Sequence, residues 1–130
     1  MLSTLEHEHI VRFHGTARNK SYLYIVQEFC PDTLRANIFG KTAIQLAPQR
    51  KLELSLQICE GMRYLHSQNI MHRDLKPANV LISAAGTVCI CDFGLARYKE
   101  QINSVREAFH FFCLLILFFC LLTLYSFVQW

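Results

Sequence analysis

The sequence predicts an α+β fold in which short strands lie on both sides of one long helix. Ile10–Gly15 and Tyr22–Phe29 are short, partly β-branched and partly aromatic stretches, which is typical of strands. A longer segment opened by Pro48 has apolar residues at helical spacing. Asn79–Ile82 and Thr87–Cys91 have the composition of two further short strands.

The first two strands are predicted to form a hairpin, because only Asn19–Ser21 separates them. Pro31 and Asp32 then interrupt the strand pattern. Asp32 or Thr33 is expected to cap a short helix that ends at about Ile38, since Asp and Thr are favoured at helix N-termini.

The long helix is predicted from the spacing of its apolar residues. They recur on one helical face at Leu54, Ile58, Met62 and Leu65. Further apolar residues are expected to widen this face and to bury much of the helix circumference: Leu52, Leu56 and Cys59. After the helix, Gly86 indicates a turn that joins the last two predicted strands into a hairpin.

Composition excludes some classes of protein. The chain has 130 residues, which is enough for one modest domain, and its net charge of +3 is too small to favour nucleic-acid binding. Six cysteines are present, but they form no CxxC pair or Cys/His metal spacing, so reduced cytosolic thiols are the better interpretation. His7 and His9 have no third metal ligand nearby in the sequence, and we expect them to be surface residues or to make local hydrogen bonds.

Two peptides carry the chemistry. His72–Asn79 reads His-Arg-Asp-Leu-Lys-Pro-Ala-Asn, and Asp92–Gly94 reads Asp-Phe-Gly after the predicted hairpin. Taken singly, Asp74 would be a common loop residue and Asn79 a common turn former. At this joint spacing, the two peptides resemble the catalytic loop and the magnesium loop of eukaryotic-type protein kinases.

The resemblance implies a role for each matching residue. Asp74 would accept the proton of the substrate hydroxyl, and Lys76 would lie near the transferring phosphate, as in serine/threonine kinases. Asn79 and Asp92 would bind Mg²⁺, a hard cation that prefers oxygen ligands. His72 and Phe93 would act by packing.

The resemblance covers roughly Met1 to Arg97 and implies part of the two-lobed kinase fold, from the last strands of the small lobe to the magnesium-loop hairpin. Gln27 would be the gatekeeper, with Glu28 to Cys30 as the hinge whose backbone meets the adenine of ATP. Leu81 would pack beneath the adenine ring.

Parts of the family pattern do not occur in this sequence: the Gly-rich loop, the strand lysine, the glutamate that pairs with it, and an Ala-Pro-Glu motif. Kinase catalysis depends on positioning and electrostatic stabilisation. We therefore expect the chain alone to be inactive and marginally stable, with unpaired strand edges.

The predicted organisation is a partial kinase domain at 1–100, a truncated activation segment at 101–108 and a hydrophobic tail at 109–128. Residues 111–128 carry no charge, and a helix of this length, at about 1.5 Å per residue, just spans a hydrocarbon core. One interpretation of the tail is a membrane anchor with the kinase-like part cytosolic. The other, which we favour, is translated intron, because thymine-rich codons can encode most of its residues.

The sequence therefore predicts part of an ATP- and Mg²⁺-dependent protein serine/threonine kinase that acts on protein hydroxyl groups in the cytoplasm, with the membrane as a further partner if the tail is an anchor. Two alternatives come from other classes. One is a membrane-anchored, catalytically dead kinase-like module that binds partners. The other is a non-functional product of a truncated gene model.

Overall fold

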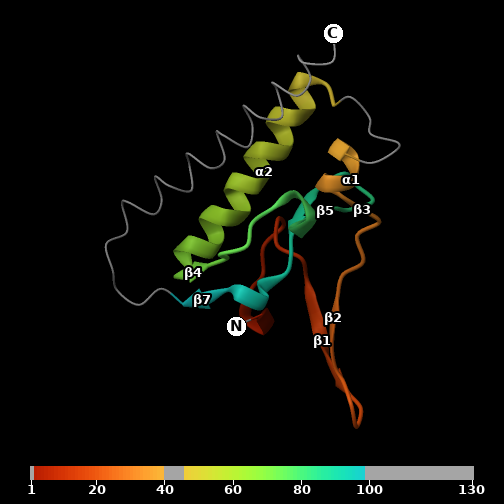
Figure 1. Ribbon diagram of the computed structural model, residues 1–130. Coiled ribbons are helices and arrows are strands. Elements are labelled where there is room, and N and C mark those ends of the chain that lie inside the picture. The colour runs from red at the N-terminus through yellow and green to blue at the C-terminus, as the bar shows by residue number, and fades with distance from the viewer. Residues whose placement is uncertain (1, 40–45, 99–130) are drawn as a thin grey trace. The chain divides into compact units, whose positions relative to one another are not determined.

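The computed structural model describes residues 2–39 and 46–98 (Figure 1). It confirms an α+β chain with one long helix. In chain order the helices and strands are β1 (Phe13–Arg18), β2 (Leu23–Gln27), β3 (Asp32–Thr33), α1 (Leu34–Phe39), α2 (Pro48–Ser67), β4 (Ile70–Met71), β5 (Val80–Ile82), β6 (Val88–Ile90) and β7 (Arg97–Tyr98). Single 3₁₀ turns lie at Leu2–Thr4, Pro77–Asn79 and Phe93–Leu95.

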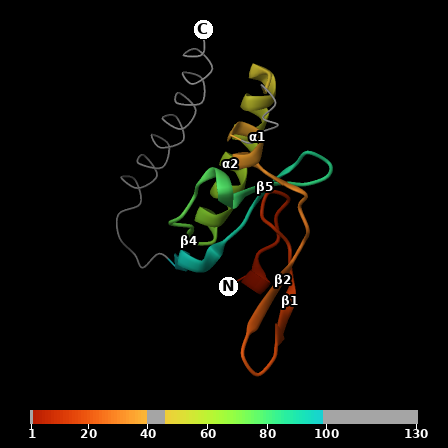
Figure 2. The ribbon, with the colours of Figure 1, turned by 45° about the vertical axis from the view of Figure 1, so that its right-hand side comes forward.

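β1 and β2 form the predicted antiparallel hairpin, which projects away from α2 in both ribbon views (Figures 1 and 2). Its turn is held by Asn19, whose Oδ1 accepts hydrogen bonds from the amides of Ser21 at 2.9 Å and Tyr22 at 2.7 Å. Such side-chain acceptance is the reason Asn favours turns. Every residue of β2 is exposed.

β1 begins at Phe13, later than predicted, because Ile10 and Val11 are buried in the core instead. They are only 4% and 6% exposed. The amide of Val11 donates to the carbonyl of Ile90 at 2.9 Å, and the amide of Ile90 donates to the carbonyl of His9 at 2.9 Å. A single parallel bridge thus fastens the start of the chain to β6.

α2 begins at the predicted proline, and its core face is the predicted one. The buried residues are Leu54, Ile58, Gly61, Met62 and Leu65. A Cβ added at Gly61 would lie 2.9 Å from both the His9 carbonyl oxygen and Ile90 Cδ1, so a glycine allows this close packing. The prediction that Leu52 and Leu56 widen the buried face is wrong: they are 60% and 56% exposed. At about 100° per residue, these two positions project from the side opposite Leu54.

β5 and β6 form the predicted hairpin, with Leu81 opposite Cys89, and β3 adds to the other edge of β5. Gly86 occupies the turn at φ 83°, a conformation that favours glycine. The predicted helix cap before α1 is Thr33, whose Oγ1 accepts a hydrogen bond from the amide of Ala36 at 3.1 Å. β6 is fully buried and contacts α2.

β4 and β7 form a two-stranded ladder that the sequence did not predict. Both motif peptides, 72–79 and 92–94, lie between these two strands along the chain. Ile70 of β4 pairs with Tyr98 of β7, and Met71 pairs with Arg97. The ladder therefore ties the residue pair before His72 to the residues that follow Asp92–Gly94.

No helix within residues 2–39 and 46–98 is both long enough and apolar enough to cross a membrane. The predicted tail at 109–128 and the segment at 101–108 lie outside these described residues.

Candidate active site

The imidazole of His72 connects the two motif peptides. The side chain is only 1% exposed. Nε2 lies 2.8 Å from the carbonyl oxygen of Cys91, and Nδ1 lies 3.3 Å from the amide nitrogen of Asp74. Because that amide can only donate, Nδ1 is the acceptor and Nε2 carries the proton. The ring also packs against Phe93, with a centroid separation of 5.2 Å.

Three predicted site residues meet in one hydrogen-bonded cluster. Lys76 Nζ lies 2.7 Å from Asp74 Oδ2. Asn79 Nδ2 donates both to the same carboxylate oxygen at 3.0 Å and to the Asp74 carbonyl at 2.8 Å. Asn79 is buried, at 6% exposure, and its amide holds Asp74 through both its carbonyl and its carboxylate.

These contacts favour the ionised form of Asp74. The hydrogen bond from Lys76 is the main cause that lowers the pKa of the Asp74 carboxyl, and the bond from Asn79 acts in the same direction. The same Asp74 contact raises the pKa of Lys76. A carboxylate that is ionised at neutral pH can accept a proton from a hydroxyl group.

Asp92 has a left-handed backbone conformation, with φ 63° and ψ 71°. This conformation is uncommon outside glycine, though Asp tolerates it better than most residues. Its Oδ1 accepts a hydrogen bond from the amide of Gly94 at 3.3 Å, and Asp92 itself is exposed while Phe93 is buried. The buried Phe93 ring thus fixes the segment while the carboxylate stays accessible.

Backbone pairing brings Asn79 and Asp92 into adjacent positions. The amide of Cys91 donates to the Asn79 carbonyl at 3.0 Å, and Asp92 follows directly. With Nδ2 of Asn79 bonded to Asp74, Oδ1 is the side-chain atom that remains to face a cation. An amide oxygen and a carboxylate are suitable donors for Mg²⁺. No group of three or more His, Cys, Asp and Glu side chains suited to a metal occurs in the described part of the chain, so such a site would rely on this mixed pair.

Of the predicted adenine-binding residues, Gln27 and Leu81 lie on strands, whereas Glu28 and Cys30 lie in the connection after β2. Gln27 ends β2, and the amide of Glu28 donates to the Arg12 carbonyl at 2.8 Å. Leu81, on β5, is partly buried. The thiols of Cys30 and Cys89 share a hydrogen bond, which places Cys30 beside β6.

Burial is the main influence on the pKa values of Cys30, Cys89 and Cys91. It raises the pKa of Cys30, and it is the main cause that raises the pKa of Cys89 to about 12 and of Cys91 to about 11. Thiolate is the reactive form of cysteine, so these side chains are poor nucleophiles at neutral pH.

The sequence missed one buried polar contact. His9 is 5% exposed, with Nδ1 3.2 Å from the Val88 carbonyl and Nε2 3.1 Å from Glu60 Oε2. His9 is therefore not a surface residue: its amide does make a local hydrogen bond, to His7, but its ring is buried and contacts residues remote in the sequence. His7 does accept a local bond, from the amide of His9 at 3.1 Å, and its ring stacks on Tyr64. The partner Glu60 lies far along the chain, and no local pattern indicates the pair.

Comparison with known proteins identifies the family. A sequence model of the protein kinase domain matches residues 1–113. This chain belongs to the protein kinase domain family. The match extends beyond Arg97, to which the resemblance of the motifs was traced.

Curated relatives indicate the serine/threonine class. The chain is 42% identical over 108 residues to a probable serine/threonine-protein kinase of Dictyostelium discoideum, covering 80% of this chain and 18% of that protein. It is 39% identical over 107 residues to mitogen-activated protein kinase kinase kinase 1 of Arabidopsis thaliana, covering 82% of this chain and 17% of that protein. It is also 44% identical over 92 residues to eukaryotic translation initiation factor 2-alpha kinase 2 of Plasmodium berghei, covering 68% of this chain and 3% of that protein. The chain thus spans less than a fifth of the length of each of these relatives.

Proposed function

We propose that this chain carries the base and metal-binding part of a protein serine/threonine kinase site that transfers phosphoryl groups from ATP–Mg²⁺ to protein hydroxyls. The observation that carries the proposal is the cluster of Asp74, Lys76 and Asn79, joined through Cys91 to Asp92. In phosphoryl transfer the protein contributes mainly positioning and electrostatic stabilisation. A fixed, ionised carboxylate beside two oxygen donors meets that need on one side of the nucleotide.

Each side chain has a defined task in the proposed site. Asp74 orients the attacking hydroxyl and accepts its proton. Lys76, held 2.7 Å from Asp74, supplies positive charge next to the transferring phosphate. Asn79 Oδ1 and the Asp92 carboxylate would hold Mg²⁺, which neutralises phosphate charge when bound. Gln27, Glu28, Cys30 and Leu81 would hold the adenine.

We further propose that the chain alone does not transfer phosphate. Gln27 and Glu28 are exposed at the end of a two-stranded sheet, so a nucleotide at the hinge would stay in contact with water. Electrostatic stabilisation is weaker where water enters a site.

Metal-dependent nucleotide binding tests the proposed metal ligands. Binding of a fluorescent ATP analogue to the full chain is measured by titration with and without Mg²⁺. The Mg²⁺-dependent part of the affinity should fall roughly 10-fold or more in Asp92→Asn, because a metal ligand is lost. Glu53→Gln is the matched control, since it removes the same charge from an exposed residue on α2. Unchanged Mg²⁺ dependence in Asp92→Asn would contradict the assignment.

A phosphoryl-transfer assay tests the proposal that the chain alone does not transfer phosphate. The full chain is incubated with labelled ATP, Mg²⁺ and a general protein substrate, alongside Asp74→Asn. No transfer above that variant is expected. Transfer by the unaltered chain that disappears in Asp74→Asn and Asp92→Asn would refute inactivity and strengthen the role assignments.

A further inference from the structure

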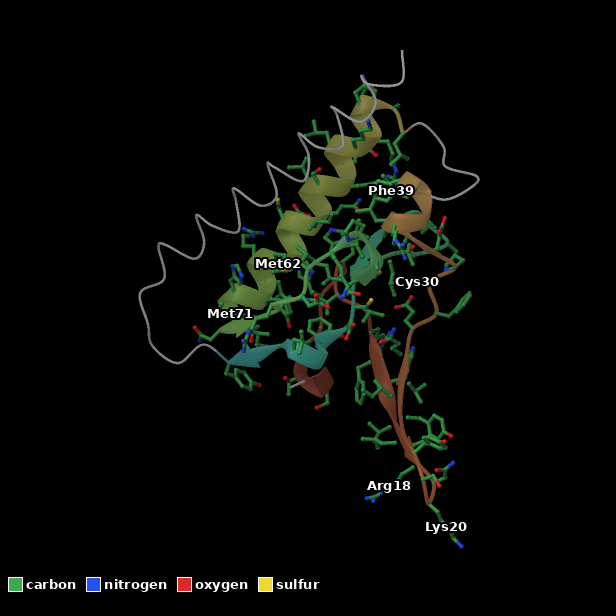
Figure 3. The ribbon with its side chains drawn as sticks, viewed as in Figure 1. Arg18, Lys20, Cys30, Phe39, Met62 and Met71 are labelled. Carbon is green, nitrogen blue, oxygen red and sulfur yellow. The ribbon has the colours of Figure 1, made fainter. Side chains whose placement is uncertain are left out.

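Two free thiols from distant parts of the chain, those of Cys30 and Cys89, are in contact. Cys30 lies in the connection between β2 and β3 (Figure 3), and Cys89 is the middle residue of β6. The two thiols share a hydrogen bond, and the Sγ of Cys89 also lies 3.9 Å from the carbonyl oxygen of Glu8. Thiols that are already in contact need only a short approach to reach the disulfide S–S distance of about 2.05 Å.

The contact lies on the face of the β5–β6 hairpin that carries Leu81. Leu81 and Cys89 are cross-strand partners, and the side chains of such a pair project to the same face. Ile90, the next residue of β6, projects to the other face, where its Cδ1 packs close to Gly61 of α2. Cys30 therefore meets the hairpin on the side of Leu81 and not on the side of α2.

The two thiols differ in acidity and in access. Burial is the largest influence and raises both pKa values, but the shared hydrogen bond lowers the pKa of Cys30 and raises that of Cys89, which reaches about 12. Cys30 is also partly exposed, whereas Cys89 is 5% exposed. Since the thiolate is the nucleophile, Cys30 reacts first with an oxidant from solution, and Cys89 is the resolving thiol. Because both pKa values are raised, this first step is slow at neutral pH and requires sustained exposure to the oxidant.

We propose that Cys30 and Cys89 form a reversible disulfide that joins the β2–β3 connection to β6 when the chain is exposed to hydrogen peroxide. The Cys30 sulfur attacks one peroxide oxygen and breaks the O–O bond, giving a sulfenic acid, and the other oxygen leaves as water with the thiol proton. The Cys89 sulfur then attacks the Cys30 sulfur, and the sulfenic hydroxyl leaves as a second water with the Cys89 proton. Two thiols are thus oxidised to one disulfide, and one peroxide is reduced to two waters.

A consequence for nucleotide binding rests on the proposed function of Glu28, Cys30 and Leu81 as adenine-binding residues. Closure of the S–S bond draws Cys30 toward Cys89 over the face that carries Leu81. A ligand slot depends on a shape that is largely formed in advance. The disulfide should therefore narrow the adenine slot, so that the oxidised chain has the lower affinity for ATP.

Peptide mapping tests the disulfide in the full chain. After peroxide treatment and alkylation, the chain is digested without reduction, and the peptides linked to Cys30 are quantified by mass spectrometry. Linkage should fall roughly tenfold or more in Cys89→Ser, where a sulfenic-acid probe such as dimedone should instead label Cys30. Cys91→Ser is the matched control, because Cys91 lies two residues away and the hydrogen bond joins Cys30 to Cys89. Linkage that persists in Cys89→Ser, or that is lost equally in Cys91→Ser, would overturn the proposal.

Titration with a fluorescent ATP analogue tests the consequence for nucleotide. The oxidised chain should bind the analogue roughly tenfold more weakly than the reduced chain, and dithiothreitol should restore the affinity. In Cys89→Ser, peroxide should change the affinity little. Equal affinities of the linked and the reduced chain would overturn this consequence. A reduced chain that binds no analogue would contradict the proposed function, whereas the disulfide itself is decided by the peptide mapping.

Discussion

The β1–β2 hairpin and the region formed by α2, β5 and β6 are stabilised in different ways. In the hairpin, strand pairing and the Asn19 turn supply the described contacts, and every residue of β2 is exposed. In the second region, β6 is fully buried against α2, and Leu65 is 0% exposed. An isolated two-stranded hairpin is marginal in water, whereas apolar burial is the main favourable term in folding. The proposed chemistry resides in the region that has a core.

The largest effect that would sharpen this contrast is expected at Leu65. Leu65→Ala removes a fully buried side chain and should lower the free energy of unfolding by about 2–5 kcal/mol, a large share of the stability of a small domain. Leu56→Ala is the matched control on the same helix, where the side chain is 56% exposed and a loss within about 0.5 kcal/mol is expected. Urea unfolding followed by circular dichroism measures both, and similar losses would contradict the assignment of the buried face.

Thiol reactivity compares the two regions by chemistry. Burial raises the pKa of Cys89 to about 12, so at pH 7.5 its thiolate fraction should be roughly 10³-fold below that of an ordinary cysteine. Ser21→Cys supplies the exposed reference in the hairpin turn. Alkylation rates are measured peptide by peptide in reducing buffer by mass spectrometry. Equal rates would show that the β5–β6 region opens as readily as the hairpin.

The raised pKa of Cys89 also makes the free energy of unfolding depend on pH. The native pKa of Cys89 lies above its ordinary value of 9.0, so its contribution to stability is complete below pH 9 and is lost as the pH rises toward 12. The free energy of unfolding should therefore decline above pH 9, and less so in Cys89→Ala.

A smaller loss of stability is expected when the hydrogen bond from His72 to the Cys91 carbonyl is removed. His72→Phe keeps a ring next to Phe93 but removes the bond to the Cys91 carbonyl, which should cost about 1–3 kcal/mol. His14→Phe is the matched control, because His14 is exposed in β1. Thermal unfolding that ranks the two variants equally would contradict the bridging role.

The smallest effect should be confined to the hairpin. Asn19→Ala removes the acceptor of two amide hydrogen bonds in the turn, and local opening should become easier by about 1 kcal/mol. Hydrogen exchange at the amides of Ser21 and Tyr22 measures this, with the amides of β6 as the internal control. Faster exchange in β6 as well would show that the two regions open together.

The sequence predicted those features that have a local signature. α2 was predictable because its core residues recur at helical spacing. Asp74, Asn79 and Asp92 were singled out because their two peptides resemble motifs of the protein kinase family. The family was confirmed by comparison, while the individual roles remain predictions. Helical geometry places Leu52 and Leu56 opposite Leu54, and the prediction that they widen the buried face was wrong because it took their apolar character as a sign of burial.

Other features arise from tertiary structure alone. β4 and β7 have two residues each, too few to show an alternating pattern. The burial of His9 depends on Val88 and Glu60, which are remote in the sequence. Ile10 and Val11 have strand-like composition, and only the position of β6 decides that they enter the core.

The bridge between Ile10 and Ile90 has a consequence for synthesis on the ribosome. Its two residues are separated by most of the described chain, so the backbone hydrogen bonds of residues 9 and 11 cannot form until β6 has emerged. At roughly 5–20 residues per second, that interval lasts on the order of ten seconds. The hairpin, whose contacts are local, can close long before then. Nascent chains halted before residue 90 should therefore present an exposed hairpin to chaperones while the site that holds Asp74 is still unformed.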